Sequence, residues 1–524
     1  MPEDPQSPFH APIITPRSGA SHTQLTVLAL VLAYCFYRYV QKQMQYRSET
    51  AFGDAHGCLP MKAKIPFKWP LSLDLVKQTW DANTDQRLLA FYQQFFDNLG
   101  PNLEQKLLGG IGYVTIDPEN IETLLSTKFQ DFGLGSRRPA FMPFLGEGIL
   151  TQDGSAAERS RDLLRRQFVR AQYQNLEGFS EHVDNLLACM SSSSSGAVDL
   201  QPLFFRFTLD TTTAFMFGQS IGSLKSDVLE SFGSSFNEAS LISSMRVRLS
   251  DFYWAYTPSR YSRACAVIKR YTDDYVNLAL SEVKGHGADA TSNRYVFIKE
   301  LYEELHDPAL VRDQLVNVLM AGRDSTACLM SWAFHLLLRH PQVLERVRRE
   351  ITSVVGDEQN LTRAHVRKLP YLKCVLDETL RLFPSAPINI RTSLRTTSFP
   401  RGGGPDGSSP VLIRKGMGIG YSIYHMHRRR DLYGEDAAIF RPERWEGSKL
   451  AHIGWGYLPF NGGPRTCLGK DFAAMEATYG IVRILQTFPN MRLPPGLQLE
   501  EVGMEKQALT LTVSIANGCK VQLY

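Results

Sequence analysis

The sequence has few cysteines, and they form no dense pattern. Eight cysteines are spread over 524 residues, at positions 35, 58, 189, 265, 328, 374, 467 and 519. No two of them have the Cys-x-x-Cys spacing of structural zinc sites. The sequence therefore argues against structural zinc and a disulfide framework, and it favours a reducing compartment.

A strong charge of either sign is also missing. Lys and Arg number 57 against 53 Asp and Glu, which gives a formal net charge of +4. No basic tract with interleaved aromatic residues occurs, so we expect no nucleic-acid partner. Internal repeats are absent as well. With 43% hydrophobic and 21% charged residues, the chain can bury one large core and is neither disordered nor fibrous.

One long apolar run does occur, near the N-terminus. Residues 23–40 are almost continuously apolar, and Arg38, Lys42 and Arg47 lie at or beyond the end of the run. A membrane span takes about 20 residues, so the run suffices if Arg38 reaches the lipid surface. Positive charge after the run predicts that the rest of the chain is cytosolic. The alternatives are a cleaved signal peptide and a buried core helix.

The apolar run divides the chain into four expected parts. They are a lumenal tail at 1–22, a transmembrane anchor at 23–40, a basic, proline-containing linker at 41–70 and a catalytic domain at 71–524.

Helical patterns dominate the middle of the last part, and strand patterns lie at its ends and over 391–423. A strand is expected over 112–116, followed by a helix that Asp117–Pro118 opens. A C-terminal hairpin is expected between 509–515 and 519–523, turning through Asn517–Gly518. The expected fold class is mainly α, with a large helical domain and a small β-rich part.

The most informative segment is the glycine-rich loop 460–469, which contains one cysteine. Its glycines let the backbone approach a flat partner closely or adopt positive φ. A helical segment opens near Lys470, and the free amides and partial positive charge of that helix N-terminus favour a thiolate at Cys467. Such a thiolate suits a soft metal such as haem iron. The alternative is a buried cysteine that packs as a small hydrophobe.

Five residues of this loop match a haem-ligand signature, Phe-x-x-Gly-x-Arg-x-Cys-x-Gly, at every specified position: Phe460, Gly463, Arg465, Cys467 and Gly469. The chain therefore resembles the cytochrome P450 superfamily, from about Leu59 to Tyr524. The resemblance implies the cytochrome P450 fold, a haem b cofactor (iron protoporphyrin IX) and Cys467 as the axial ligand of the iron.

A Glu-x-x-Arg pair lies upstream, in a helix predicted to begin after Pro370 and to stop before Pro384. Glu378 and Arg381 share one helical face at i and i+3, where they can form an ion pair. The resemblance implies that Arg444 completes a structural triad that holds the cysteine loop, since buried charges are costly unless they are paired. Alone, such a pair is usually solvated.

A second upstream signal is the segment 321–326, Ala-Gly-Arg-Asp-Ser-Thr, inside a helix predicted over 308–338. A mid-helix glycine beside an acid and hydroxyls weakens the backbone ladder. The resemblance implies an oxygen-binding groove across the distal haem face, where Asp324, Ser325 and Thr326 deliver protons. Ser325 stands where the family usually has threonine, and it lacks the methyl group that restricts χ1. A packed core helix is the alternative.

A haem also needs cationic partners for its two propionates. The resemblance assigns this role to Arg465, Arg391 and Arg161. The family usually has a tryptophan four residues before the arginine at position 161. Ala157 stands there in this chain, so one hydrogen-bond donor to a propionate is missing. The residues that could replace it are Arg159 and the pair Arg137–Arg138.

Five segments are candidates for the substrate pocket, with ordinary core packing as the alternative for each. They are Leu319, Met320, Ile388, Asn389 and Phe252–Tyr253–Trp254.

Several motifs, among them 440–445 and 458–465, resemble the fungal microsomal alkane and fatty-acid hydroxylase branch. The resemblance implies a haem-thiolate monooxygenase on the cytosolic side of the endoplasmic reticulum membrane. This enzyme would insert one oxygen atom of O2 into a C–H bond of a lipophilic chain, or of a fungal polyketide or terpenoid intermediate of secondary metabolism.

The implied electron source is NADPH, through the FAD- and FMN-containing NADPH–cytochrome P450 reductase, with cytochrome b5 as a further possible partner. Two alternatives remain open from the sequence. One is a haem-thiolate isomerase or dehydratase that acts without external electrons, and the other is a non-catalytic haem-binding membrane protein.

Overall fold

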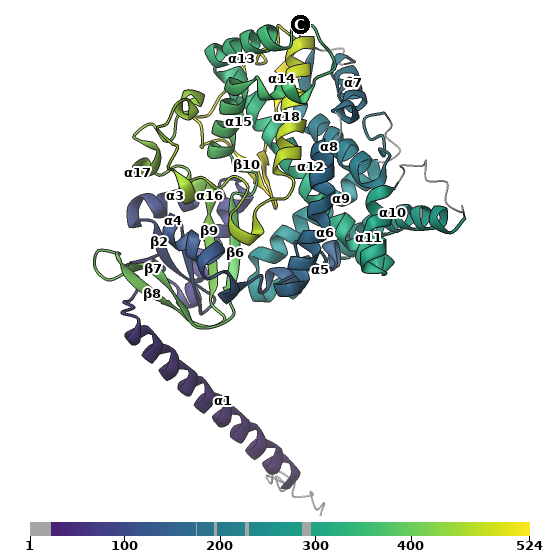
Figure 1. Ribbon diagram of the computed structural model, residues 1–524. Coiled ribbons are helices and arrows are strands. Elements are labelled where there is room, and N and C mark those ends of the chain that lie inside the picture. The colour runs from purple at the N-terminus through teal and green to yellow at the C-terminus, as the bar shows by residue number, and fades with distance from the viewer. Residues whose placement is uncertain (1–21, 174–175, 193–195, 226–229, 286–294, 524) are drawn as a thin grey trace, which may run out of the picture. The chain divides into compact units, whose positions relative to one another are not determined.

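The computed structural model describes residues 22–173, 176–192, 196–225, 230–285 and 295–523 (Figure 1). Residues 1–21, to which the sequence assigns a lumenal tail, lie outside the described residues. The chain divides into two compact units, Met1–His56 and Gly57–Tyr524, which are described separately.

The described part of the first unit is a single helix, α1 (His22–Ala55). It continues past residue 40, so the start of the segment expected as a linker is helical. Its apolar side chains are exposed, among them those of Leu28, Leu30 and Phe36. No helix among the described residues is both long enough and apolar enough to cross a membrane, so the span expected over 23–40 is not confirmed.

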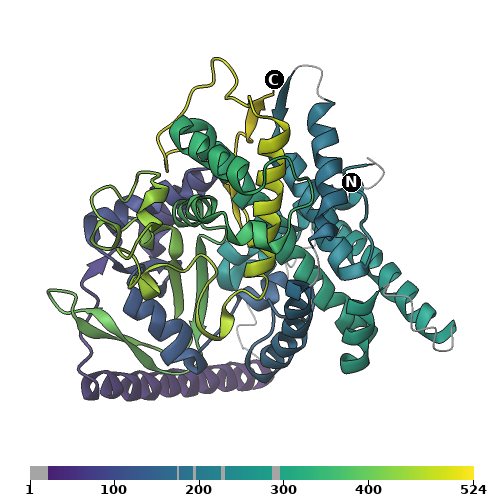
Figure 2. The same ribbon diagram turned by 45° about the horizontal axis from the view of Figure 1, so that its top comes forward.

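The second unit is mainly helical, as the sequence predicts. Its longer helices are α2 (Leu73–Thr84), α3 (Leu88–Leu99), α5 (Arg137–Leu145), α6 (Gly154–Tyr173), α7 (Glu177–Ser191), α8 (Leu200–Phe217), α9 (Glu230–Arg248), α10 (Ser259–Gly285), α11 (Val296–Leu305), α12 (Pro308–Arg339), α13 (Pro341–Val354), α15 (Pro370–Leu382) and α18 (Lys470–Thr487). Four short helices are α4 (Pro118–Glu122), α14 (Arg363–Arg367), α16 (Ile423–Met426) and α17 (Arg430–Tyr433). In both views the long helices α8 to α11 lie on one side of this unit and most strands on the other (Figure 2).

Six strands form the larger sheet, in the order β1 (Ala63–Lys64), β2 (Asn102–Leu107), β3 (Gly110–Thr115), β9 (Gly418–Ser422), β6 (Ile388–Ser393) and β4 (Phe132–Gly133). The pairs β1–β2 and β3–β9 are parallel, and the others are antiparallel. Strand β3 and the helix α4 after it appear where the sequence predicts them. The antiparallel pair β7 (Thr397–Gly403) and β8 (Ser409–Ile413) forms a separate ribbon.

The predicted C-terminal hairpin is wrong. Segment 509–515 contains a turn, so β10 (Gln507–Leu509) pairs with β11 (Val513–Ile515). The last strand, β12 (Lys520–Gln522), pairs instead with β5 (Ala197–Asp199). The Asp199 carboxylate accepts the amide of Cys519 at 2.8 Å, and this long-range contact directs the last strand away from β11.

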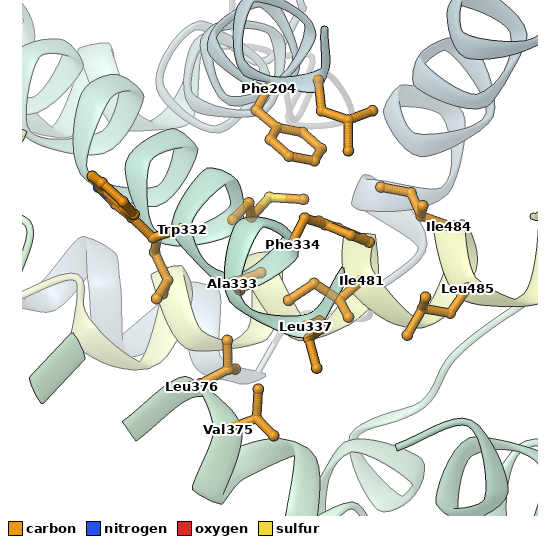
Figure 3. Packing of buried hydrophobic residues seen from close by; sticks show 14 of the residues in the cluster. Phe204, Trp332, Ala333, Phe334, Leu337, Val375, Leu376, Ile481, Ile484 and Leu485 are labelled. Carbon is orange, nitrogen blue, oxygen red and sulfur yellow. The ribbon is translucent and has the colours of Figure 1, made fainter. Parts of the chain in front are cut away.

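Helix α12 passes through the middle of the core, where α8, α15 and α18 surround it (Figure 3). Its carboxyl half is buried on all sides because it carries a nearly continuous apolar sequence. Trp332 stacks on Phe383 with ring centroids 3.7 Å apart, and its indole nitrogen donates to the Val513 carbonyl at 3.1 Å. These contacts fix α12 against the segments that carry the candidate site.

Candidate active site

The cysteine loop is held by its own backbone and by a required glycine. The Cys467 amide donates to the Phe460 carbonyl at 2.9 Å, which closes the loop just before α18 begins at Lys470. Gly463 has a φ of +61°, and a β-carbon there would lie 2.0 Å from the Leu125 carbonyl oxygen. Any other residue at 463 would have to displace backbone.

The Cys467 side chain is exposed, although protein surrounds the loop. Burial raises the pKa of its thiol, while the Gly469 amide and the side chains of Arg161 and Lys470 lower it. A metal that binds this sulfur would remove the proton outright. The site therefore presents one accessible sulfur, with nearby donors and cations that favour its thiolate form.

Four arginines gather beside this loop with few acidic partners. Arg465 donates to the Asp153 carboxylate at 3.2 Å. Burial, together with the neighbouring charges of Arg391 and Arg465, lowers the pKa of Arg137 to about 10. Burial and the charges of Arg391 and Arg161 likewise lower the pKa of Arg465. The cluster thus has an excess of buried positive charge, which favours a bound anion.

The predicted structural triad is assembled in a fully buried setting. Arg381 donates from Nε to Oε2 and from Nη2 to Oε1 of Glu378, both at 2.8 Å. Arg444 Nε donates to Glu378 Oε1 at 3.4 Å, and Trp445 Nε1 donates to Oε2 at 3.0 Å. Neither Glu378 nor Arg381 has an exposed side-chain surface.

The remaining donors of the triad bind the chain that leads to the cysteine loop. Arg381 Nη1 donates to the carbonyls of His427 at 2.8 Å and Ala437 at 2.6 Å. Nε2 of His427 accepts the amide of Leu458, at 2.9 Å, just before the loop begins. Through these bonds, α15 fixes the segment that ends in the loop.

The polar residues of α12 point in different directions. Asp324 is buried and pairs with its neighbour Arg323, Nη1 to Oδ1 at 2.7 Å. Burial raises the pKa of Asp324, and Arg323 lowers it. The Ser325 hydroxyl donates to the Ala321 carbonyl at 2.7 Å. Thr326 is buried on the side facing α18, where it contacts the carboxyl group of Glu476.

One short stretch of α12 is open in a helix that is otherwise buried. Ala321 is exposed, and Gly322 and Ser325 are half-buried, whereas the residues on either side are buried. Ala321 and Ser325 lie at i and i+4 and therefore share one helical face, whereas a β-carbon at Gly322 would point toward Thr212 of α8. The face is compatible with a ligand that lies flat against the helix.

Comparison with known proteins identifies the family. A family model described as Cytochrome P450 matches residues 67–512. The chain belongs to the cytochrome P450 family. It is therefore a monooxygenase, an oxidoreductase whose family implies a haem cofactor.

The relatives of this cytochrome P450 include several fungal proteins that match most of their own length. A protein named Cytochrome P450 from Arthroderma benhamiae is 42% identical over 95% of this chain and 98% of the relative. Cytochrome P450 52A13 from Debaryomyces hansenii is 38% identical over 85% of this chain and 89% of the relative. Cytochrome P450 52A5 from Candida maltosa is 41% identical over 78% and 80%, respectively.

The residues of this cytochrome P450 fit a haem. Cys467 offers an accessible sulfur, the arginine cluster matches two propionates, and Ala321 and Ser325 form an open face of small residues on α12. Among the described residues, Asp153 is the carboxylate that forms an ion pair with this cluster, so a dianion would relieve the mutual repulsion of its cations.

Of the arginines named as replacements for the tryptophan that Ala157 replaces, the structure brings one, Arg137, into the arginine cluster. Arg161 donates to the Thr466 carbonyl at 2.5 Å, beside the cysteine. Arg159 is exposed, and Arg138 forms an ion pair with Glu147. Arg137 instead lies with Arg391, and both donate to the Asn389 side-chain oxygen. Asn389 was a pocket candidate in the sequence, and its oxygen here orients the two arginines.

The other pocket candidates have mixed surroundings. Leu319 and Met320 are buried in an apolar cluster with Phe144 and Phe236. Phe252 and Trp254 are exposed. No sequence pattern indicates Asn389 as an arginine partner or Glu476 as a site residue, because their contacts join segments far apart in the chain.

Proposed function

We propose that this cytochrome P450 inserts one oxygen atom of O2 into a C–H bond of a lipophilic chain, with electrons from NADPH delivered by an FAD- and FMN-containing reductase. The accessible Cys467 sulfur beside an excess of arginine charge is the observation that carries the proposal. Cytochrome b5 is a second candidate electron donor.

In this proposal Cys467 Sγ binds the haem iron, and Arg465, Arg391, Arg161 and Arg137 hold the propionates. The bound haem supplies the activation of dioxygen. The Glu378–Arg381–Arg444 triad keeps the cysteine loop rigid through the chain before it. Ser325 and Thr326 carry protons to the open face of α12, and Asp324 takes part after it separates from Arg323.

A charged-headed substrate, such as a fatty acid, is favoured over an alkane by Arg248, at the end of α9. The Arg248 side chain is exposed, and its guanidinium donates to the Leu509 carbonyl. Among the described residues it forms no ion pair with a carboxylate. Leu511, two residues further, packs against the cluster that contains Leu319 and Met320. A chain in that cluster would place its carboxylate within reach of Arg248.

The substrate test compares a fatty acid with the alkane of equal chain length. Because a charge-assisted hydrogen bond to carboxylate is lost, Arg248→Gln is expected to raise KM for the acid roughly tenfold and to leave KM for the alkane unchanged. Arg248→Lys should recover part of the loss. Equal effects on both substrates would assign Arg248 a packing role.

Attachment to the endoplasmic reticulum membrane is part of the proposal. It is supported by the exposed apolar side chains of α1 and by a second exposed apolar group at the start of the catalytic unit, which comprises Phe67, Trp69, Leu71, Leu108 and Ile111. Apolar surface of this extent is typical of membrane or protein contacts.

Reduced protein exposed to carbon monoxide gives the first test of the function. Wild type should show the red-shifted Soret band of thiolate-bound haem, and NADPH with reductase should yield an oxygenated product. Cys467→Ser should lose both. Cys374→Ser, which changes a partly buried cysteine outside the loop, should keep both. Turnover that needs no NADPH would instead identify an isomerase or dehydratase.

A further inference from the structure

A Thr-Pro dipeptide lies in the segment that joins two long helices of the catalytic unit. Helices α9 and α10 pack against each other, and residues 249–258 connect them. A short 3-10 helix, Ser250–Ala255, is followed by irregular backbone at 256–258. Thr257 is exposed there, and Pro258 after it favours an extended backbone at the threonine. The segment thus presents a hydroxyl group in the form that a proline-directed protein kinase accepts.

A buried cation is directed at this hydroxyl group. Arg246, near the end of α9, has an exposed fraction of 3%. Its Nη1 donates to the Tyr256 carbonyl at 3.1 Å and to the Thr257 hydroxyl, and its Nε donates to the Ala140 carbonyl at 3.0 Å. The guanidinium also lies over two tyrosine rings, at 5.4 and 5.3 Å.

The partners of Arg246 supply no negative charge. Its hydrogen-bond acceptors are uncharged oxygen atoms, and among the described residues it forms no ion pair with a carboxylate. Burial of a cation without an anion is costly. A negative charge on the Thr257 side chain would lie within hydrogen-bond distance of Arg246 and would balance it.

The first turn of α10 adds positive charge beside the threonine. The first amides of a helix have no acceptor within it and carry a partial positive charge. Arg260 and Arg263 are exposed on this turn. Arg260 pairs with Glu238 at 2.7 Å, whereas Arg263 forms no ion pair among the described residues. Asp251 is an opposing charge in the connecting segment, so cations outnumber acids around the threonine.

We propose that Thr257 is a phosphorylation site for a proline-directed protein kinase, and that Arg246 and the start of α10 hold the phosphate. The Thr257 hydroxyl oxygen attacks the terminal phosphorus of ATP. A new O–P bond forms, the bond from that phosphorus to the bridging oxygen breaks, ADP leaves, and the hydroxyl proton passes to a base of the kinase.

The phosphate has the charge and the acceptors that this site lacks. It carries about −1.5 to −2 charges at neutral pH and three acceptor oxygens. It can therefore bind donors from α9 and α10 at the same time, with charge-assisted hydrogen bonds. The inference does not depend on the proposed oxygenase function, because it uses neither the cysteine loop nor α12.

The chain also offers an internal control for the kinase. Ser409–Pro410 is the other Ser-Pro or Thr-Pro dipeptide among the described residues. It belongs to strand β8, where Ser409 pairs with Gly403 of β7, so its backbone is already bonded within a ribbon. We expect no phosphorylation there. Ser7–Pro8 and Thr15–Pro16 lie outside the described residues, and all assays use a chain that carries Ser7→Ala and Thr15→Ala.

Kinase labelling tests the site. The full-length, haem-loaded protein is incubated with ATP and a purified proline-directed kinase, and mass spectrometry locates the phosphate. Thr257 should carry it. Thr257→Val should abolish labelling, Thr257→Ser should keep it, and Ser409→Ala should leave it unchanged. Absence of phosphate from Thr257, or equal labelling of Ser409, would overturn the proposal.

The pH titration of the phosphate tests whether the arginines hold it. The second pKa of a phosphothreonine is about 6 without neighbouring charges. Nearby cations stabilise the dianion, so the phosphorus-31 resonance of the folded protein should titrate about one pH unit lower than that of the same phosphoprotein in urea. Equal midpoints in the folded and unfolded protein would overturn the proposal.

Two variants and a control identify the donors. Arg246→Gln should move the midpoint of the folded phosphoprotein back toward the value in urea. Arg263→Gln leaves the buried guanidinium in place and should move it part of the way, so it decides if Arg246→Gln does not fold. Arg270→Gln changes an exposed arginine two turns further along α10 and should leave the midpoint unchanged. Equal shifts in Arg263→Gln and Arg270→Gln would contradict a phosphate held at the start of the helix.

Discussion

The buried charge of Glu378 is tolerated because several donors bind it. Glu378 accepts hydrogen bonds from Arg381, Arg444 and Trp445, and from the amide of Arg441 at 3.0 Å. All of these groups donate hydrogen bonds, so they stabilise the ionised form of the Glu378 carboxylate. Removing the charge would leave the buried Arg381 guanidinium without a carboxylate and would leave Arg444 only its pair with Asp436, and such a loss costs far more than an exposed pair contributes.

We therefore expect Glu378→Gln to lower the free energy of unfolding by about 3–5 kcal/mol. The control is Glu119→Gln, which breaks the exposed pair with Arg401, 2.6 Å apart. That change should cost at most about 1 kcal/mol. Urea unfolding of both variants measures the difference. Equal losses would show that the Glu378 network contributes no more than a surface ion pair.

The residues of the cysteine loop and of the Glu-x-x-Arg pair could be found from the sequence, because short spacings define them. From the sequence, Arg137 could be named only as one of several possible replacements for the missing propionate donor. Its place beside Arg391 depends on a shared bond to Asn389, more than 250 positions further along the chain. Glu476 gave no signal, because its partners come from two other helices.

Among the helices, α12 shows most clearly how local rules and packing compete. Its start follows from sequence, since the Asp307 carboxylate caps the amides of Ala309 and Leu310. Gly322 in its middle contradicts helix propensity, which favours alanine by up to about 1 kcal/mol. The reason is packing: a β-carbon at 322 would lie 2.8 Å from the Thr212 hydroxyl oxygen and 3.0 Å from its methyl group.

Gly322→Ala is therefore expected to destabilise the protein by about 1–3 kcal/mol, the usual cost of overpacking. Combining it with Thr212→Ala should recover most of that loss, because the clash is removed. Gly233→Ala in α9 is the matched control, since no atom lies within 4 Å of a β-carbon there, and it should stabilise slightly. Thermal unfolding of the four variants measures the coupling. Simple additivity of the 212 and 322 changes would contradict the packing explanation.

The limits of element prediction have the same origin. Caps and prolines set the ends of α12 and α15, and these were predicted within a few residues. The partner of β12 was predicted wrongly, because Asn517–Gly518 has the composition of a hairpin turn. The pairing with β5 is decided by bonds to Asp199 from more than 300 residues away. The residues of a turn do not indicate that a distant strand such as β5 will pair with β12 instead.

At the scale of the whole molecule, the two units differ in what buries their apolar residues. The three apolar clusters of the described chain contain no residue before Met61. The apolar side chains of α1 are exposed by contrast. The catalytic unit therefore contains its own core, and α1 needs another environment, which we propose to be a membrane.

Deletion of residues 1–56 should accordingly leave the thermal unfolding of the catalytic unit and its carbon monoxide band unchanged, while moving the protein from the membrane fraction to the supernatant. The control keeps α1 but replaces Leu28, Val31 and Leu32 with serine. It should also leave the membrane, because loss of apolar surface and not of length weakens attachment. If the truncated protein stays with the membrane, the exposed group around Trp69 and Ile111 carries the attachment instead. A lower unfolding temperature after truncation would show that α1 stabilises the catalytic unit, against the independence of the two cores.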